Sequence, residues 1–567
     1  MMRSWNPAYP PKDAIPWCRE AKPFCTSVKV IGISAACLVG FFVLYSAMEN
    51  KPFYGQRTSD SGPWRKDVDF DDIIRRTREM GEYFAQPVQE PKDKLLGGLL
   101  PEGLDVNSCV SRYQSALYRK EQKHQPSSHL VSRLRKYEAL HKQCGPFTES
   151  YNRSLEYLKS GSHSQYTNST GCKYVIWTHP IHGLGNRILS LASAFLYALL
   201  TNRVLLVDPE SEVPDLFCEP FEVSWLLPSD FPLIGNFSGF DKNSPQSFGT
   251  LLKNISRGSS NSSSLPPYIY LHLLHDYDDD NKRFFCNQDQ PVVQNVTWLI
   301  AKSNVYFAPA LFSVSTFQQE ISSLFPDLGT VFHHLGRYLF HPTNFVWGLI
   351  TTYYDTNLAR ADERIGIQIR VFEKDPELKL LDQIMACAAK ENLLPLVNGT
   401  EPVASQSGKL KTKAVLIASL EYGYFKAMRS MYWKHSTVTG EVIEVHQPSH
   451  EKHQYNEKKM HNIKAWAEMY LLSLTDNLVT SADSTFGYVA HSLGGLKPWI
   501  LYKPENHVAP DPPCRRAVSK EPCMHAPPYY DCITKQWTGP GAKLDPHVQH
   551  CDDKWYGIKF IDREENL

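Results

Sequence analysis

The chain has 567 residues, and its 60 lysines and arginines balance its 60 aspartates and glutamates, so the formal net charge at pH 7 is zero. A neutral chain lacks the basic excess that is typical of nucleic-acid-binding proteins. Its length is sufficient for two large α/β domains with an N-terminal extension. Partners therefore have to be inferred from individual sites and not from overall charge.

A membrane anchor is predicted near the N-terminus. Residues 30–48 carry no charged side chain, and as a helix they would span about 28 Å, close to the thickness of the hydrocarbon core of a bilayer. A cleaved signal peptide is the alternative, because small residues close the segment. We expect an uncleaved anchor between a cytoplasmic tail at residues 1–29, which contains several prolines, and a polar stem at residues 49–92.

Glycosylation sequons indicate which side of the membrane the rest of the chain occupies. Lysines and arginines flank the predicted helix almost equally, so charge does not decide the orientation. Every Asn-x-Ser/Thr sequon lies after the helix, as expected for a chain whose C-terminal part enters the secretory lumen. The sequons begin at Asn152, Asn168, Asn236, Asn254, Asn261, Asn295 and Asn398.

The cysteines agree with an oxidising compartment. Of the 13 cysteines, Cys18, Cys25 and Cys37 precede or lie within the predicted anchor, which leaves ten beyond it. An even number in an oxidising compartment predicts up to five disulfides. A zinc site is the alternative, because three cysteines near the C-terminus recur every nine residues, but no Cys-x-x-Cys pair accompanies them.

Folded structure is predicted to begin near Asp93. Residues 93–165 predict helices, one of which, at residues 127–145, has a capping serine and a terminal glycine. Strands then alternate with helices, first from about residue 170 to 350, with strands predicted at residues 173–177 and 203–208. The alternation resumes from about residue 360, with strands predicted at residues 364–372, 413–420 and 477–482 and a helix at residues 484–495 that a glycine ends. We therefore expect two doubly wound, Rossmann-like domains that face a cleft, at residues 93–355 and 356–567.

A glycine-containing loop, "HGLGNR" (His182–Arg187), follows the first predicted strand and precedes an amphipathic helix. This places Gly185, Asn186 and Arg187 at the ligand-binding edge of a parallel sheet, where helix N–H groups and a guanidinium could face an anion. The loop lacks the third glycine of a dinucleotide-binding fingerprint, and a plain connection is the alternative.

Two features of the second half also predict an anion site. Arg370 ends a predicted buried strand, where a guanidinium is costly unless it meets an anionic ligand or an internal carboxylate. In "TSADSTFG" (Thr480–Gly487), Ser484 and Thr485 lie at a strand-to-helix turn whose N–H groups and dipole favour phosphate. Ordinary N-capping explains the same turn equally well.

Together, "HGLGNR", "GIQIRVF" and "DSTFGYVAHSLGGLKPW" resemble the plant α-1,2-fucosyltransferase family, and most closely its xyloglucan fucosyltransferases, from about residue 93 to the C-terminus. The resemblance implies a GT-B-type, inverting transferase that uses GDP-fucose without a metal or other cofactor. Arg370 would hold the β-phosphate, Gly185, Asn186 and Arg187 would line the cleft from one side, and Ser484, Thr485 and Phe486 would hold the donor from the other. Related fucosyltransferases have a histidine two residues before the arginine, where this chain has Gln368.

A catalytic base is expected near the acceptor hydroxyl. "HLLHDYDDDNK" (His272–Lys282) follows a hydrophobic strand and gathers imidazoles and carboxylates. We expect Asp276 to be this base, with His275 and Asp279 as further acceptor-side candidates. A solvated acidic loop is the alternative, and fucosyl transfer by a dissociative route would not require a strong base.

These features predict a single-pass type II Golgi membrane protein with a lumenal catalytic domain. Its partners would be GDP-fucose, a galactosylated cell-wall polysaccharide, the Golgi membrane and either a second copy or other glycosyltransferases, but no nucleic acid. It would transfer L-fucose to O-2 of terminal galactose on xyloglucan. Two alternatives remain open: another galactose- or arabinose-containing acceptor such as arabinogalactan protein, and a non-catalytic carbohydrate-binding or assembly protein.

Overall fold

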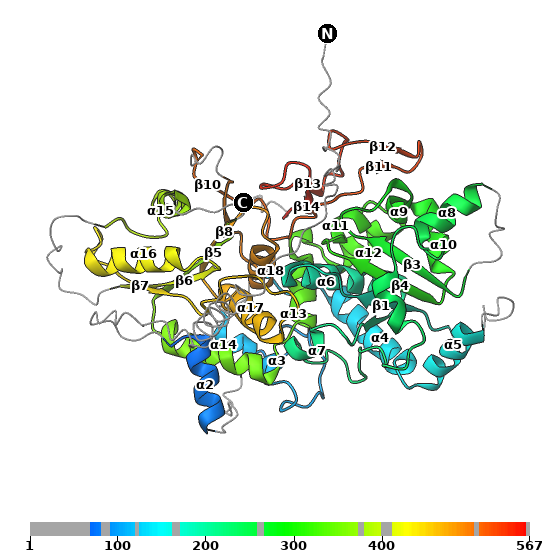
Figure 1. Ribbon diagram of the computed structural model, residues 1–567, viewed down its shortest axis with the longest axis horizontal. Coiled ribbons are helices and arrows are strands. Elements are labelled where there is room, and N and C mark those ends of the chain that lie inside the picture. The colour runs from blue at the N-terminus through cyan, green and yellow to red at the C-terminus, as the bar shows by residue number, and fades with distance from the viewer. Residues whose placement is uncertain are drawn as a thin grey trace, which may run out of the picture. The chain divides into compact units, whose positions relative to one another are not determined.

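Two mainly parallel β-sheets, formed by successive halves of the chain, organise the fold (Figure 1). The computed structural model describes residues 68–80, 91–119, 124–160, 171–257, 266–371, 379–397, 411–503 and 510–562. The predicted cytoplasmic tail and transmembrane helix lie outside the described residues, as do the sequons at Asn168, Asn261 and Asn398. The described part belongs to one compact unit that begins at Asp67.

The first sheet has four parallel strands in the order β2-β1-β4-β3. Its strands are β1 (Tyr174–Thr178), β2 (Val204–Val207), β3 (Tyr268–Leu273) and β4 (Trp298–Ser303). Between β1 and β2 runs α6 (Leu184–Thr201), which confirms the predicted strand, loop, helix and strand. Although α6 is apolar enough to cross a bilayer, 83% of it is buried inside the fold, as expected of a core helix.

The second sheet has six strands in the order β10-β9-β8-β5-β6-β7, of which only β10 runs antiparallel to its neighbour. Its strands are β5 (Glu363–Ile369), β6 (Thr412–Ser419), β7 (Val442–His446), β8 (Asn477–Ser481), β9 (Trp499–Leu501) and β10 (Cys514–Arg516). The predicted strands at residues 364–372 and 413–420 correspond to β5 and β6. After β8 comes α18 (Thr485–Gly494), which ends at Gly495 in the left-handed conformation, as the glycine predicted.

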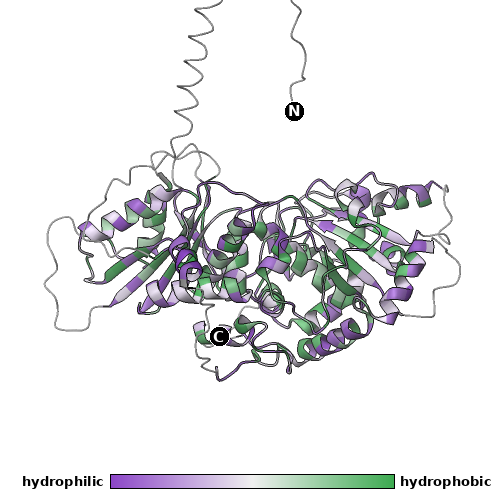
Figure 2. Ribbon diagram, turned by 60° about the horizontal axis from the view of Figure 1, so that its bottom comes forward, coloured by the Kyte–Doolittle hydropathy of each residue, from purple (hydrophilic) through white to green (hydrophobic). Residues whose placement is uncertain are grey.

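One hydrophobic cluster spans the two halves, and each half also has a smaller cluster of its own on the other face of its sheet. Leu189 of α6, Leu335 of α13, Leu349 of α14, Trp466 of α17 (Lys459–Leu472) and Val489 of α18 are all buried in the same cluster. Figure 2 shows hydrophobic residues concentrated on strands and helices in the interior of the described chain, and hydrophilic residues more often on the peripheral helices. The other helices are α3 (Val110–Gln114), α4 (Ser128–Cys144), α5 (Glu149–Ser160), α7 (Val213–Leu216), α8 (Phe248–Ser256), α9 (Asp279–Lys282), α10 (Gln290–Gln294), α11 (Ala308–Leu311), α12 (Ser315–Leu324), α13 (Val331–Leu339), α14 (Asn344–Asn357), α15 (Lys379–Lys390) and α16 (Tyr422–Lys434).

Five disulfides confirm the sequence-based prediction. They join Cys109 to Cys218, Cys144 to Cys172, Cys286 to Cys532, Cys387 to Cys514 and Cys523 to Cys551. The three cysteines spaced nine residues apart belong to three different disulfides, so they form no zinc site. The Cys286–Cys532 bond ties the C-terminal segment, which contains β11 (Tyr530–Asp531), β12 (Gln536–Trp537), β13 (Val548–His550) and β14 (Ile558–Phe560), to the first half of the chain (Figure 1).

The start of the fold differs from the prediction. We expected a polar stem up to residue 92, but α2 (Phe70–Met80) packs against α14. Phe70 is fully buried beside Tyr353, with ring centroids 5.4 Å apart, and its backbone N–H donates to Pro448 O at 2.8 Å. Only Phe70, Ile73 and Ile74 form the apolar stripe of α2, which is easily overlooked among its many charged residues.

We predict that Phe70→Ala, in a secreted chain beginning at Lys66, lowers the free energy of unfolding by about 3–5 kcal/mol, because it removes a fully buried ring. Arg76→Ala, on the exposed face of the same helix, is the matched control and should change stability by less than about 0.5 kcal/mol. Denaturant unfolding measures both. Equal stability of the two variants would show that α2 does not contribute to the fold.

Candidate functional site

A cavity of about 290 Å³ opens at the carboxyl edge of the second sheet, where parallel sheets commonly bind ligands. Five segments of the second half line it: the ends of β5 and β6, the turn before α18, the region from Ser449 to α17, and His525 of the C-terminal segment. The first half contributes Gly183, which caps α6, and the first turn of α6, including Gly185 and Asn186. The cavity therefore lies where the two halves of the chain meet.

The N-termini of α6 and α18 meet at Gly185 without room for a side chain. A Cβ on Gly185 would lie 2.7 Å from the backbone carbonyl of Thr485 and 2.9 Å from the nitrogen of Phe486. Next to it, Thr485 Oγ1 donates to Asn186 Oδ1 at 3.0 Å. Gly185 is thus required for the close packing of two helix ends, and Asn186 fixes them together beside the cavity.

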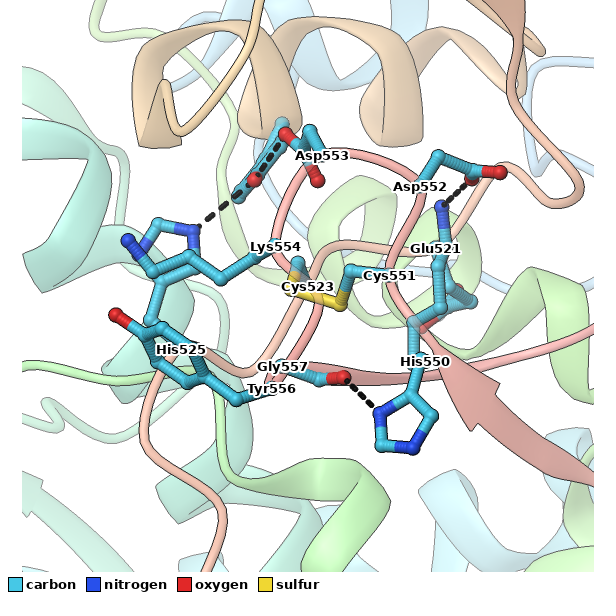
Figure 3. The surroundings of a disulfide bond; sticks show 12 residues. Glu521, Cys523, His525, His550, Cys551, Asp552, Asp553, Lys554, Tyr556 and Gly557 are labelled. Carbon is cyan, nitrogen blue, oxygen red and sulfur yellow. Dashed lines mark hydrogen bonds and ion pairs between the residues drawn. A yellow bond between two sulfur atoms is a disulfide. The ribbon is translucent and has the colours of Figure 1, made fainter. Parts of the chain in front are cut away.

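Asp483 precedes α18 and is bonded to Asp553 and Lys554 of the C-terminal segment, which Figure 3 shows close to the Cys523–Cys551 disulfide. Its backbone is left-handed, with φ at 57°, its N–H donates to Asp553 Oδ2 at 3.0 Å, and its Oδ2 accepts from Lys554 Nζ at 3.0 Å. Asp553 and Lys554 follow Cys551, whose disulfide to Cys523 fixes this segment. The turn that presents the α18 N-terminus is therefore pre-organised.

The α18 N-terminus and Arg370 form the positive side of the cavity. Ser484 caps the helix by accepting from the Gly487 N–H, and Ser484, Thr485 and Phe486 all line the cavity, as the sequence predicted. Arg370 follows the last residue of β5 and lines the same cavity, while its backbone N–H donates to Ser481 Oγ at 2.9 Å. A guanidinium and a helix N-terminus side by side are suited to an anionic ligand.

Gln368, two residues before Arg370, has a structural partner. Thr480 Oγ1 donates to Gln368 Oε1 at 2.8 Å, and both side chains are buried. A Cβ at Gly487 would lie 2.0 Å from the same Thr480 hydroxyl. The glutamine therefore belongs to the packing between β5, β8 and α18 as well as to the wall of the cavity.

The far wall of the cavity contains acidic residues that the sequence did not single out. Glu468 of α17 accepts from Ser449 Oγ at 2.7 Å, and its burial raises its pKa to about 8. Burial also acts to raise the pKa of Glu451, but ion pairing with Lys464 outweighs it and lowers that pKa. Glu468 occupies an ordinary helical position in "KAWAEMYLL", so no local pattern could have revealed it.

Arg187 does not line the cavity, contrary to the sequence-based prediction. Its guanidinium donates to His182 O at 2.7 Å and to Asn456 O at 2.6 Å, and it forms a buried ion pair with Glu212. Because a helix turns 100° per residue, Arg187 points away from the face that carries Asn186. Its role is to connect the loop before α6 with the Asn456 segment.

The predicted acceptor-side residues also lie outside the cavity lining. Partial burial acts to raise the pKa of Asp276, but hydrogen bonds from His272 and Lys242 outweigh it, and the lowered pKa makes Asp276 a weak base. Asp279 lies at the start of α9 and pairs with Lys282. His275 instead joins a polar cluster in which Asn304 Nδ2 lies 2.8 Å from His275 Nδ1 and 2.9 Å from His182 Nε2.

The described residues offer one group that resembles a metal site, and its chemistry excludes a metal. Cys523, Cys551 and Asp553 have ligand-type atoms within 4.8 Å of one another. The two sulfurs are bonded to each other, and Asp553 accepts from Tyr488 Oη at 2.5 Å. A disulfide cannot supply thiolate ligands.

Comparison with known proteins identifies the family. The sequence model of the xyloglucan fucosyltransferase family matches residues 70–533. A pea (Pisum sativum) protein named galactoside 2-alpha-L-fucosyltransferase is 59% identical over 86% of each chain, and an Arabidopsis thaliana protein of the same name is 55% identical over 83% of each chain.

A solved structure agrees with these relatives. A point mutant of Arabidopsis thaliana FUT1 in complex with GDP is 53% identical and has a TM-score of 0.76, covering 83% of this chain and 100% of that one. Its match establishes the mixed α/β glycosyltransferase fold for the described residues. From the family match over most of its length and from relatives that are more than half identical, the chain belongs to the xyloglucan fucosyltransferase family.

Proposed function

We propose that this protein transfers L-fucose from GDP-fucose to O-2 of terminal galactose on xyloglucan side chains, with inversion at the fucosyl carbon. The observation that carries the proposal is the pairing of Arg370 with the α18 N-terminus in one cavity. It is supported by relatives named galactoside 2-alpha-L-fucosyltransferases and by a neighbour that binds GDP.

The two halves would then serve as the two sides of a GT-B-type transferase. The second half holds GDP at the carboxyl edge of its sheet, and the loop before α6 closes the cavity from the acceptor side. As the bond between fucose and the β-phosphate breaks, negative charge grows on the phosphate oxygens. The Arg370 guanidinium, the Ser484 and Thr485 hydroxyls and the free N–H groups of α18 can stabilise that charge.

The acceptor hydroxyl must lose a proton during transfer. Asp276, the base expected from the sequence, is tied to His272 and Lys242 outside the cavity lining. We therefore propose that stabilisation of the departing GDP contributes more to the rate than a strong base does. A dissociative transition state agrees with a larger contribution from leaving-group stabilisation than from a base, because the acceptor proton then leaves late in the reaction.

We further propose that the chain is a type II Golgi membrane protein. This rests on the charge-free segment at residues 30–48 and on sequons confined to the part beyond it. Four of those sequons are described: Asn152, Asn236 and Asn295 are exposed and Asn254 is partly so, which makes them accessible to glycosylation. Five disulfides favour the same oxidising compartment.

A secreted chain that begins at Lys66, and so retains α2, is expected to carry N-glycans and to fucosylate galactosylated xyloglucan. The assay supplies GDP-fucose with xyloglucan, degalactosylated xyloglucan and arabinogalactan protein, and it identifies the linkage of the product. Transfer only to arabinogalactan protein would replace the proposed acceptor. If the folded protein neither hydrolyses GDP-fucose nor transfers fucose to any of these acceptors, a binding or assembly role would be favoured.

We expect the reaction to be independent of a divalent metal. Excess chelator should leave initial rates within about twofold of the untreated enzyme, because Arg370 and the α18 N-terminus supply the positive charge that a metal provides elsewhere. In the control, Mn²⁺ is added to the enzyme after treatment with chelator. A large loss of rate that Mn²⁺ reverses would refute this mechanism.

Arg370→Lys is expected to fold normally and to lose roughly 10²- to 10³-fold in kcat, about 2.7–4 kcal/mol, with weaker GDP binding. Lysine keeps the charge but cannot form two parallel hydrogen bonds to phosphate oxygens. Arg364→Lys is the matched control, because Arg364 lies at the opposite end of β5 and pairs with Asp476 at 3.5 Å.

Melting temperature, GDP affinity and kcat are measured for both arginine variants. The control should retain kcat and GDP affinity whatever happens to its stability. A destabilised Arg370→Lys protein with normal kcat and GDP affinity would show that Arg370 is a structural residue.

A further inference from the structure

The first turn of α2 lies against residues 448–451, the segment that follows β7 and forms part of the cavity wall. Two of these residues, Ser449 and Glu451, line the cavity. The Phe70 backbone N–H donates to Pro448 O at 2.8 Å. The first described helix after the predicted anchor therefore touches the wall of the cavity, although none of its own described residues lines it.

A chain of two ion pairs extends this contact from α2 to Glu451. Asp71 Oδ1 lies 2.8 Å from Lys464 Nζ, and the same ammonium donates to Glu451 Oε1 at 2.8 Å. The Lys464 side chain is only 8% exposed. Burial acts to lower the pKa of Lys464, but its hydrogen bonds and ion pairs with both carboxylates outweigh burial and raise that pKa. Lys464 is therefore a buried cation that depends on a partner from α2.

Asp71 determines where this ammonium can hold Glu451. Lysine carries its charge on a flexible four-carbon stem, so a single carboxylate does not fix its position. Asp71 holds the ammonium from the α2 side, and Glu451 meets it from the cavity side. His461 Nδ1 lies 3.6 Å from Glu451 Oε2 and also lines the cavity. A displacement of Lys464 would therefore disturb two side chains of the wall.

We propose that Asp71 is a positioning residue of the donor site. By holding Lys464 it fixes Glu451 in the cavity wall, so that α2 sets the affinity for GDP-fucose as well as the stability of the fold. This inference rests on the proposed function, because it assigns α2 to the same site. The phosphate contacts of Arg370 and α18 belong to other segments of the lining, so the effect falls on donor binding and not on the chemical step.

The test measures transfer by the full-length protein in membranes, with GDP-fucose as the varied substrate. Asp71→Asn removes the charge and keeps the shape of the side chain. It is expected to raise the KM for GDP-fucose roughly three- to tenfold, the effect of losing about one hydrogen bond. Its kcat should stay within about twofold of wild type, and the inhibition constant for GDP should rise by the same factor as KM.

Asp72→Asn is the matched control. Asp72 shares the first turn of α2, and so the same favourable interaction with the helix dipole, but it pairs with Arg75 within the helix. Its KM for GDP-fucose should equal that of wild type. Asp71→Glu keeps a carboxylate and should bring the KM back to within about twofold of wild type.

A second variant tests the route through the lysine. Lys464→Gln should raise the KM for GDP-fucose at least as much as Asp71→Asn does. Adding Asp71→Asn to Lys464→Gln should cause no further rise, because both substitutions break the same link. If Lys464→Gln does not fold, Asp71→Asn and Asp71→Glu decide the question by themselves.

The temperature of half-inactivation, measured on the same membranes, separates positioning from a purely structural ion pair. A lowered inactivation temperature in Asp71→Asn with an unchanged KM overturns the positioning role and leaves the proposed function intact. An equal rise of KM in Asp72→Asn, or a further rise in the double variant, also overturns it. A wild-type protein that neither transfers fucose from GDP-fucose nor is inhibited by GDP overturns the proposed function itself.

Discussion

The missing side chain at Gly185 is the constraint on which the cavity depends. It lets the N-terminus of α6, from the first half, touch the backbone of Thr485 and Phe486 in the second half. A methyl group there would clash with backbone atoms at 2.7 Å, and backbone cannot move aside as a flexible side chain can. Because the two helices also belong to the shared core, separating them would disrupt both the cavity and the packing of α17.

The C-terminal segment applies a second constraint to the same place. Asp553 accepts hydrogen bonds from the Asp483 N–H and from Tyr488, so it fixes the turn before α18 and the first turn of α18 together. The Cys523–Cys551 and Cys286–Cys532 disulfides anchor this segment, the latter to the first half of the chain. A left-handed aspartate costs about 1–3 kcal/mol, and these contacts hold it in place.

The resulting cavity is electrostatically uneven, and this asymmetry connects the structure to the proposed chemistry. Arg370 and the α18 N-terminus make one part of the lining positive, whereas Glu468 and Glu451, the latter paired with Lys464, place acidic side chains in another part. A nucleotide sugar has the complementary asymmetry, with an anionic diphosphate and a base rich in donors.

Local sequence patterns were sufficient to predict the parts of the site that lie at the ends of strands. Buried apolar runs predicted β1, β5, β6 and β8. Arg370, directly after β5, and Ser484, in the turn between β8 and α18, line the cavity. The ten cysteines beyond the predicted anchor were sufficient to predict the number of disulfides, because an even number allows every cysteine a partner. They were not sufficient to predict which cysteines pair. These features depend on neighbours in sequence or on composition, which a single chain reveals.

The tertiary structure determined those properties of the site that depend on contacts between residues distant in sequence. Arg187 has the same local context as Asn186, yet Glu212 and the Asn456 carbonyl draw its guanidinium away from the cavity. Hydrogen bonds from Lys242 and His272 lower the pKa of Asp276, and Phe70 is buried beside Tyr353, a residue far along the chain. Glu468 is the clearest case: its position on α17 is unremarkable in the sequence, and only the packing of α17 against α14, α18 and β5 buries it at a cavity and raises its pKa. The charge state, burial and hydrogen bonding of a side chain depend on its neighbours in space, whereas strand and helix patterns depend on residues that are close in sequence.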